Sequence, residues 1–184
     1  LADEVWRRVD QLRNAGSEPV TVLSCLPSFR FAAGDYAIYS QDSRWSHENQ
    51  GRWETLTHGE RVLRCIHGRT AQGGTPWVAV ADGRRQQIVA FHLEPCGNWM
   101  IRCRLDQQGG DTFPELRIGL GLDDHALALS LAPGETLSLP PVIVQELPGT
   151  DIESGTPRLH RVLREVRRPQ AESIVMLSCD DKPG

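Results

Sequence analysis

The chain has 184 residues, of which 39% are hydrophobic and 24% charged, an ordinary composition for a folded globular protein. Its formal net charge of −4 argues against a general nucleic-acid-binding protein, which needs a net basic surface. No apolar run approaches the ~20 residues that a membrane-spanning helix requires, so we expect neither a nucleic-acid nor a membrane partner.

The first dozen residues carry apolar side chains at helical spacing, but the segment that follows them argues against a helix. The stretch Asn14–Pro19, NAGSEP, is a turn that leads directly into the apolar run Val20–Leu23. A strand, a turn and a second strand explain both pieces. We therefore predict a β-hairpin at the N-terminus.

Residues 43–53, SRWSHENQGRW, form the densest group of aromatic and polar side chains. The pair His47-Glu48 begins like the zinc-protease motif HExxH, but Gly51 stands where the second histidine belongs, so neither a metal nor a cofactor is predicted. Tryptophans could form a platform for a sugar, although in a β-sandwich they more often belong to the core or to an edge. The candidates for such a platform are Trp45, Trp53, Trp77 and Trp99.

Short apolar runs separated by glycine, proline and aspartate predict an all-β fold of about ten strands. Between the runs Trp77–Val80 and Ile88–Phe91, the dipeptide Asp82-Gly83 predicts a hairpin. Asp123-Asp124 interrupts a further pair of runs and is interpreted as a turn rather than a carboxylate pair. The expected fold class is all-β, a large antiparallel sandwich with one C-terminal α-helix.

The predicted helix begins near Thr156, a suitable N-cap, and Pro157 suits its first position. Pro169 ends it, and its arginine-rich face is expected to contact solvent rather than phosphate. Ile174–Leu177 then resembles a new strand that ends almost at once. We divide the chain into a sandwich domain (residues 1–150), a connecting helix segment (151–170) and the truncated start of a following domain or a tail (171–184).

The five cysteines are odd in number and form no CxxC pair, so a zinc or redox site is not predicted. Buried free thiols in a reducing compartment are expected instead, which favours a cytoplasmic protein. The chain begins with Leu1 instead of methionine, which we interpret as the sign of a piece of a longer protein.

No motif for a nucleophile or a phosphate loop occurs in the chain. Hydrolysis of a glycoside needs two carboxylates held ~5–10 Å apart, and no local pattern marks two of the 24 acidic residues for that role. No catalytic residue is therefore predicted.

Three stretches, in this order along the chain, resemble the N-terminal supersandwich domain of melibiase-like bacterial α-galactosidases, family 36 of the glycoside hydrolases. The first runs from Gly34-Asp35-Tyr36 through Arg44-Trp45 to Glu48 and is similar to a "D-x-x-L-x-x-x-x-G-x-W-x-x-E" strand pair. Leu131–Val142 resembles an "L-x-P-G-E-…-P-x-V" segment, and the helix over Thr156–Arg168 resembles the "LHRFYR" helix that leads into the catalytic barrel. The resemblance covers most of residues 5–170.

This resemblance implies a non-catalytic domain that packs on a catalytic barrel of the same parent chain and shapes its substrate cleft. The parent would be a retaining α-glycoside hydrolase, and the chain alone would be inactive. The family's "S-R-G-x-x-S-S-H-Q" loop corresponds to His67–Gly74, where only Arg69 and the glycines match. The parent enzyme could therefore also be a related α-glycosidase with a substrate other than an α-galactoside. Candidate residues for contact with carbohydrate or barrel are Arg44, Trp45, Glu48 and Arg69.

Two other functions remain open from the sequence. The chain could be a stand-alone carbohydrate-binding module with Trp45 or Trp99 as its platform, or an interaction sandwich with no role in catalysis. Besides the barrel, the expected partners are an α-galactoside or related oligosaccharide and a second copy of the chain.

Overall fold

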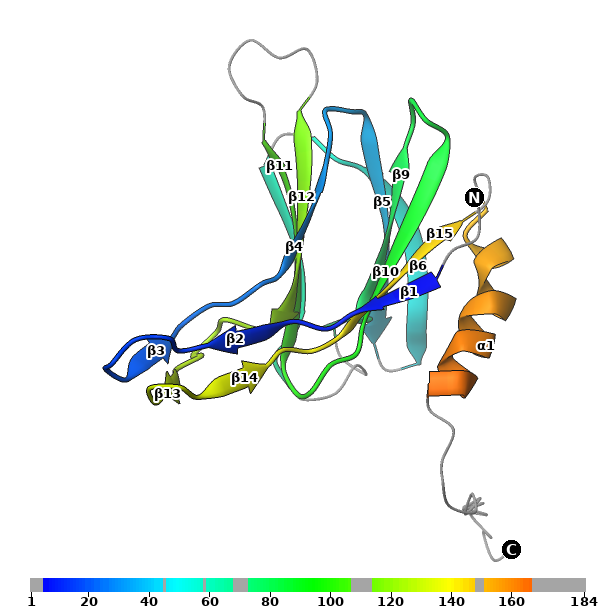
Figure 1. Ribbon diagram of the computed structural model, residues 1–184. Helices are drawn as coiled ribbons and strands as arrows, with labels where there is room; N and C mark the ends of the chain where they lie inside the picture. Colours follow the sequence, from blue (N-terminus) through cyan, green and yellow to red (C-terminus); the bar gives the residue numbers. More distant parts are fainter. Residues whose placement is uncertain are drawn as a thin grey trace, which may run out of the picture.

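The computed structural model describes residues 5–44, 46–57, 59–67, 73–106, 114–147 and 151–166. These residues form two antiparallel sheets packed face to face, and one α-helix among them lies beside the larger sheet (Figure 1). The predicted fold class, an all-β antiparallel sandwich with a C-terminal helix, is confirmed.

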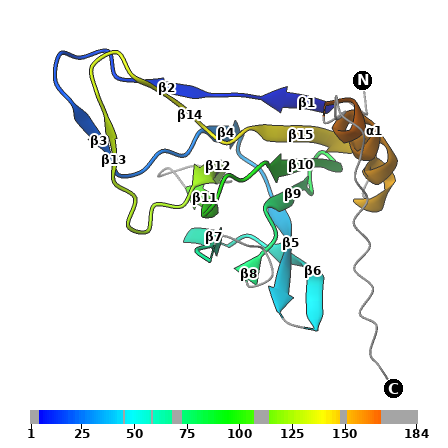
Figure 2. The same ribbon diagram turned by 90° about the horizontal axis from the view of Figure 1, so that it is seen from below.

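Besides these two large sheets, the described residues form two small sheets of two strands each (Figure 2). The larger sheet has the order β1 (Val5–Arg8), β15 (Val142–Leu147), β10 (Gln87–Leu93), β9 (Trp77–Asp82), β5 (Tyr36–Arg44) and β6 (His47–Thr55), and β8 (Gly73–Gly74) pairs with β5. The smaller sheet has the order β4 (Ser28–Phe31), β12 (Glu115–Leu122), β11 (Trp99–Asp106) and β7 (Gly59–Cys65). The two-stranded sheets are β2 (Gln11–Arg13) with β14 (Thr136–Ser138) and β3 (Val20–Val22) with β13 (Leu129–Leu131).

The main core lies between the two large sheets, because successive side chains of a strand point to opposite faces. In β10, Phe91 and Leu93 point inward, whereas Ile88 and Ala90 belong to a second apolar cluster on the outer face. Both faces of this strand therefore exclude water. The inner cluster also holds Trp99, which is 1% exposed.

The N-terminal residues are strands, as predicted, but the predicted hairpin between them is wrong. β2 pairs with β14, and β3 pairs with β13. Each of the two N-terminal strands therefore pairs with a strand far away in the sequence, and they do not pair with each other. The buried amide of Asn14 explains this, because its Nδ2 donates both to the Glu18 carbonyl (2.8 Å) and to the Leu131 carbonyl (2.9 Å). The turn between β2 and β3 is thus held against the Pro133-Gly134 turn between β13 and β14, where the Gly134 amide donates to the Asn14 carbonyl.

Two predicted turns are confirmed. β9 and β10 pair antiparallel around Asp82-Gly83, and the Arg84 amide donates to the Asp82 carboxylate at 3.0 Å. Asp123 also lies in a turn, where its carboxylate accepts a hydrogen bond from the His125 amide at 2.8 Å.

The helix starts differently from its predicted N-cap. A 3₁₀ turn, η1 (Glu153–Gly155), runs directly into α1 (Thr156–Val166), so Thr156 already has helical backbone angles and is not the cap. The Asp151 carboxylate accepts from the Glu153 amide at 2.9 Å instead, and thereby satisfies a free donor at the start of the turn. The strand-like run Ile174–Leu177 and the segment 171–184 lie outside the described residues.

Gly155 fastens this turn to the outer face of the larger sheet. A Cβ at this position would overlap the Leu147 side chain, and the Gly155 carbonyl accepts a buried hydrogen bond from Gln145 Nε2 at 2.7 Å. We expect Gly155→Ala to displace α1 and to lower the free energy of unfolding by about 1–3 kcal/mol, measured by urea denaturation. Gly83→Ala is the matched control, since its nearest neighbour lies 3.5 Å away, and an equal loss in both variants would contradict this role.

Candidate functional site

The candidate residues Arg44 and Glu48 lie at the tip of the β5–β6 hairpin. Arg44 is paired with His47 across the turn, and the Glu48 carboxylate accepts from the Ser46 amide at 3.1 Å. Both candidate side chains are exposed. The other two candidates, Trp45 and Arg69, lie outside the described residues.

The strand β8, which begins four residues after Arg69 in the sequence, pairs with β5 beside this hairpin tip. Gly73 of β8 pairs with Ser43 of β5, and Gly74 pairs with Asp42. Two stretches distant in sequence therefore converge on one end of the larger sheet.

The predicted tryptophan platform is wrong for Trp99. This side chain is 1% exposed and packs between the two sheets, so no sugar can reach it. Trp53 and Trp77 instead lie on the outer face of the larger sheet, where Trp53 is 41% exposed and Trp77 packs against the outer apolar cluster.

Four rings form a continuous row across this outer face, which we call the aromatic row: Trp53 of β6, Tyr39 of β5, Trp77 of β9 and His92 of β10. The centroids of Trp53 and Tyr39 are 5.5 Å apart, and those of Tyr39 and Trp77 are 5.3 Å apart. His92 stacks on Trp77 at 5.4 Å with an interplanar angle of 14°. Such ring pairs stabilise a sheet by about 0.5–1.5 kcal/mol each beyond the area that they bury.

Strand register builds the aromatic row. Tyr39 is directly opposite Trp53, and His92 is directly opposite Trp77, so each pair shares one face of the sheet. Gly51 has a specific role here, because a Cβ at this position would overlap the Tyr39 hydroxyl group. The glycine in the SRWSHENQGRW stretch thus leaves room for the Tyr39 ring on the edge strand.

The polar atoms of the aromatic row are only partly satisfied. Trp77 Nε1 donates to Gln41 Oε1 at 2.9 Å. His92 Nε2 is buried and has no hydrogen-bond partner within the described part of the chain. Burial disfavours the charged imidazole and lowers the pKa of His92 to about 4, so the ring is neutral at pH 7.

The helix covers only part of the outer face. Ile152, just before η1, packs on the outer cluster, and Gly155 touches Leu147 of β15. In Figure 2, α1 lies at the β1–β15 side of the sheet, whereas β5 and β6 lie at the opposite side. The Trp53 end of the aromatic row is therefore the exposed end.

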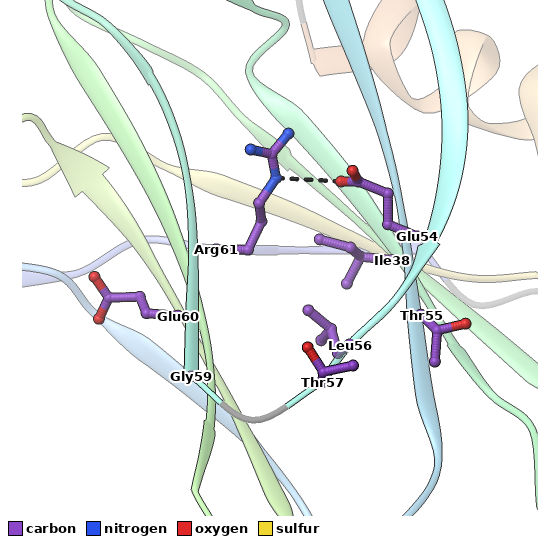
Figure 3. Close-up of a pocket in the computed structure, with 8 residues that line it drawn as sticks. All are labelled: Ile38, Glu54, Thr55, Leu56, Thr57, Gly59, Glu60 and Arg61. Atoms are coloured by element: carbon purple, nitrogen blue, oxygen red, sulfur yellow. Dashed lines mark ion pairs between the residues drawn. The ribbon is translucent and has the colours of Figure 1, made fainter.

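A pocket of about 220 Å³ opens between the sheets at the edge formed by β6 and β7 (Figure 3). Arg61 Nε lies 3.2 Å from Glu54 Oε2 across the pocket and links the two strands, with Ile38 beneath. The second carboxylate of the lining, Glu60, points away from Glu54 and pairs with Arg102 at 3.3 Å. Because each carboxylate has its own guanidinium partner, the pocket does not present the pair of facing carboxylates that glycoside hydrolysis needs.

The described cysteines differ in burial. Cys65 and Cys103 are buried, as predicted, whereas Cys25 is only partly buried, and burial raises the pKa of Cys103 to about 12. Cys96 is exposed because it lies in the turn between β10 and β11, so the prediction of buried thiols is wrong for this residue. Cys179 lies outside the described residues.

No three histidine, cysteine, aspartate or glutamate side chains within the described ranges are grouped closely enough to hold a metal ion. None of the helical structure described there has the length and apolarity needed to span a membrane.

Comparison with known proteins places the sandwich in context. Residues 2–131 match the model of a protein family described as "Glycosyl hydrolase family 36 N-terminal domain". The α-galactosidase AgaA from Geobacillus stearothermophilus is 21% identical with a TM-score of 0.77, over 87% of this chain and 22% of that chain. An α-galactosidase from Lactobacillus brevis is 16% identical with a TM-score of 0.77, over 88% of this chain and 22% of that chain.

A third similar structure is the galactosidase domain of the α-galactosidase–sucrose kinase AgaSK. It is 21% identical with a TM-score of 0.68, over 77% of this chain and 20% of that chain. The chain thus spans about a fifth of the length of these solved proteins, and at such identities the likeness shows the fold. A comparison with curated protein sequences finds no match.

Proposed function

The chain belongs to the family of glycosyl hydrolase family 36 N-terminal domains, and we propose that it serves as the non-catalytic sandwich of an α-galactosidase-like enzyme. In this role it packs on a catalytic barrel of the same parent chain and shapes the substrate cleft. The pairing of Glu54 with Arg61 and of Glu60 with Arg102 supports a non-catalytic role for the pocket at the β6–β7 edge.

The observation that carries the barrel contact is the exposed end of the aromatic row. Trp53 is 41% exposed beside Tyr39, on the same outer face that α1 partly covers. Tryptophan and tyrosine in such positions supply most of the binding energy of many protein interfaces. The helix that by resemblance leads into the barrel lies on this face too, which favours the face as the barrel's contact surface.

The first test asks which part of the parent performs catalysis. We expect this chain to show no turnover of a nitrophenyl α-galactoside, and a protein extended through the following domain to show it. Turnover by the 184-residue chain would overturn the non-catalytic role. An extended protein without turnover would overturn the α-galactosidase assignment.

The second test addresses the contact surface. In the extended protein, Trp53→Ala should weaken the interface between sandwich and barrel by about 2 kcal/mol or more, measured as a lower unfolding transition and faster proteolysis between the domains. Trp6→Ala is the matched control, because Trp6 is 44% exposed but packs on Phe29, away from the aromatic row. Equal effects of the two substitutions would contradict the proposed surface.

A carbohydrate-binding module is the second candidate function, and the half-exposed Trp53 is the observation that favours it. Calorimetric titration of this chain with galactose and with raffinose separates the two functions. A domain that acts as a scaffold gives no heat of binding. Binding that Trp53→Ala abolishes would establish the module instead.

A further inference from the structure

The outer face of the smaller sheet carries arginines side by side on three neighbouring strands. Arg30 of β4 is directly opposite Arg117 of β12, and Arg117 is directly opposite Arg104 of β11. Figure 1 shows these three strands next to one another. Like charges at directly opposite positions of a sheet repel and destabilise it.

Most arginines of this face have an acidic partner. Arg104 Nε lies 2.6 Å from Asp106 Oδ1, and Arg102 Nε lies 3.3 Å from Glu60 Oε1. Farther along the face, Arg64 Nε lies 2.8 Å from Asp123 Oδ2. These three guanidinium groups are therefore neutralised within the chain.

Arg30 and Arg117 are the exceptions. Within the described residues, neither side chain makes a hydrogen bond or an ion pair, and both are exposed. Two adjacent positive charges that have no partner in the described part of the chain lower the stability of the sheet and are available to an external anion.

A hollow borders Arg117, one member of this pair. This pocket of about 250 Å³ lies over β11 and β12, and its lining includes Arg117, Arg104, Arg102, Ser28 and Gly119. It exists because Gly119 has no side chain, and Leu26 rests on one side of that glycine. The Glu60 carboxylate also lines the pocket but is already paired with Arg102.

We propose that Arg30 and Arg117 bind an acidic protein segment that presents two carboxylates, one of which enters the hollow beside Gly119. Guanidinium groups bind carboxylates through two parallel hydrogen bonds, which makes such pairs strong and directional. Facing residues on neighbouring strands have Cβ atoms about 5 Å apart, the spacing of glutamates one turn apart on a helix.

The charges of the face distinguish this partner from nucleic acid. Binding of DNA or RNA requires contacts to many phosphates. Here Asp106 pairs with Arg104, the direct neighbour of Arg117, Glu60 lines the same hollow as Arg117, and the chain has a net charge of −4. These negative charges disfavour a long polyanion, which favours a local pair of acidic side chains.

The test measures binding of a fluorescein-labelled poly-glutamate peptide to the 184-residue chain at low salt by fluorescence anisotropy. The double variant Arg30→Gln/Arg117→Gln should weaken binding by about tenfold, and added salt should do the same. The control Arg13→Gln/Arg161→Gln removes the same charge from exposed arginines elsewhere and should bind like the parent. Equal weakening in both variants would overturn the site, because attraction to overall charge alone would explain it.

Two further measurements constrain the proposal. Arg117→Gln should leave the unfolding transition unchanged or raise it, because it removes repulsion from Arg30; a clear loss of stability would show a structural role instead. Oligothymidylate of matched length should bind more weakly than poly-glutamate. Equal or tighter binding of the oligonucleotide would replace the acidic protein segment with a phosphate ligand.

Discussion

Trp99→Ala should lower the free energy of unfolding by about 3–5 kcal/mol, enough to leave a chain of this size marginally folded. Trp99 is 1% exposed, and its strand β11 is paired on both sides, opposite Cys65 and Leu122. Its removal leaves a cavity that two fixed strands cannot close. The measurement is urea denaturation followed by far-ultraviolet circular dichroism.

Two further variants, Trp99→Phe and Trp53→Ala, test whether the loss of stability comes from the buried position of Trp99. Trp99 Nε1 is buried and has no hydrogen-bond partner within the described residues, so Trp99→Phe removes an unsatisfied donor and should cost much less than Trp99→Ala. Trp53→Ala, at a side chain that is 41% exposed, should cost about 1 kcal/mol through its contact with Tyr39. A Trp99→Ala variant as stable as Trp53→Ala would contradict the core position.

His92 should make the folded chain less stable in acid. The pKa of its imidazole is about 4 in the folded chain and 6.5 in the unfolded reference. Below pH 6.5 the unfolded state binds a proton that the folded state does not bind, so stability falls until pH reaches about 4. At about 1.4 kcal/mol per pKa unit, the loss over this interval is about 3 kcal/mol.

His92→Phe isolates this contribution, because the phenyl ring can keep the stack on Trp77 and does not titrate. Urea denaturation at pH 7, 5.5 and 4 measures the free energy of unfolding. Between pH 7 and pH 4 this free energy should fall by about 3 kcal/mol less in the variant than in the parent chain. Carboxylates that titrate over the same interval are common to both proteins and cancel in the difference. Identical slopes would show that the imidazole is protonated in the folded state.

Local patterns made the fold class predictable. Asp82-Gly83 identifies the β9–β10 hairpin because aspartate is favoured in turns, where its carboxylate accepts a hydrogen bond from an amide two residues on, here that of Arg84. Short apolar runs between turns indicate strands, since the side-chain period of two is a property of each strand alone. The order of several weak motifs also sufficed for the family resemblance, which the match over residues 2–131 confirms.

The site residues were less predictable, because they depend on contacts between strands far apart in sequence. The stretch SRWSHENQGRW drew attention to Trp53, but its contacts with Tyr39, and through it with Trp77, arise from strand pairing. One signal was present: the run Trp77–Asp82 is apolar at nearly every position, a pattern typical of a strand covered on both faces. That pattern indicates a covered outer face without identifying what covers it.

Local patterns were enough to predict the all-β class, the turns and the family, because turn chemistry and side-chain alternation act over a few neighbouring residues. Packing between the sheets, however, places Trp99 in the core and leaves Trp53 exposed, since both follow from which face of a sheet meets another layer. The tertiary structure also pairs β2 with β14 and β3 with β13, where the buried Asn14 amide links two distant turns. Arg30 and Arg117 likewise became neighbours only through strand register.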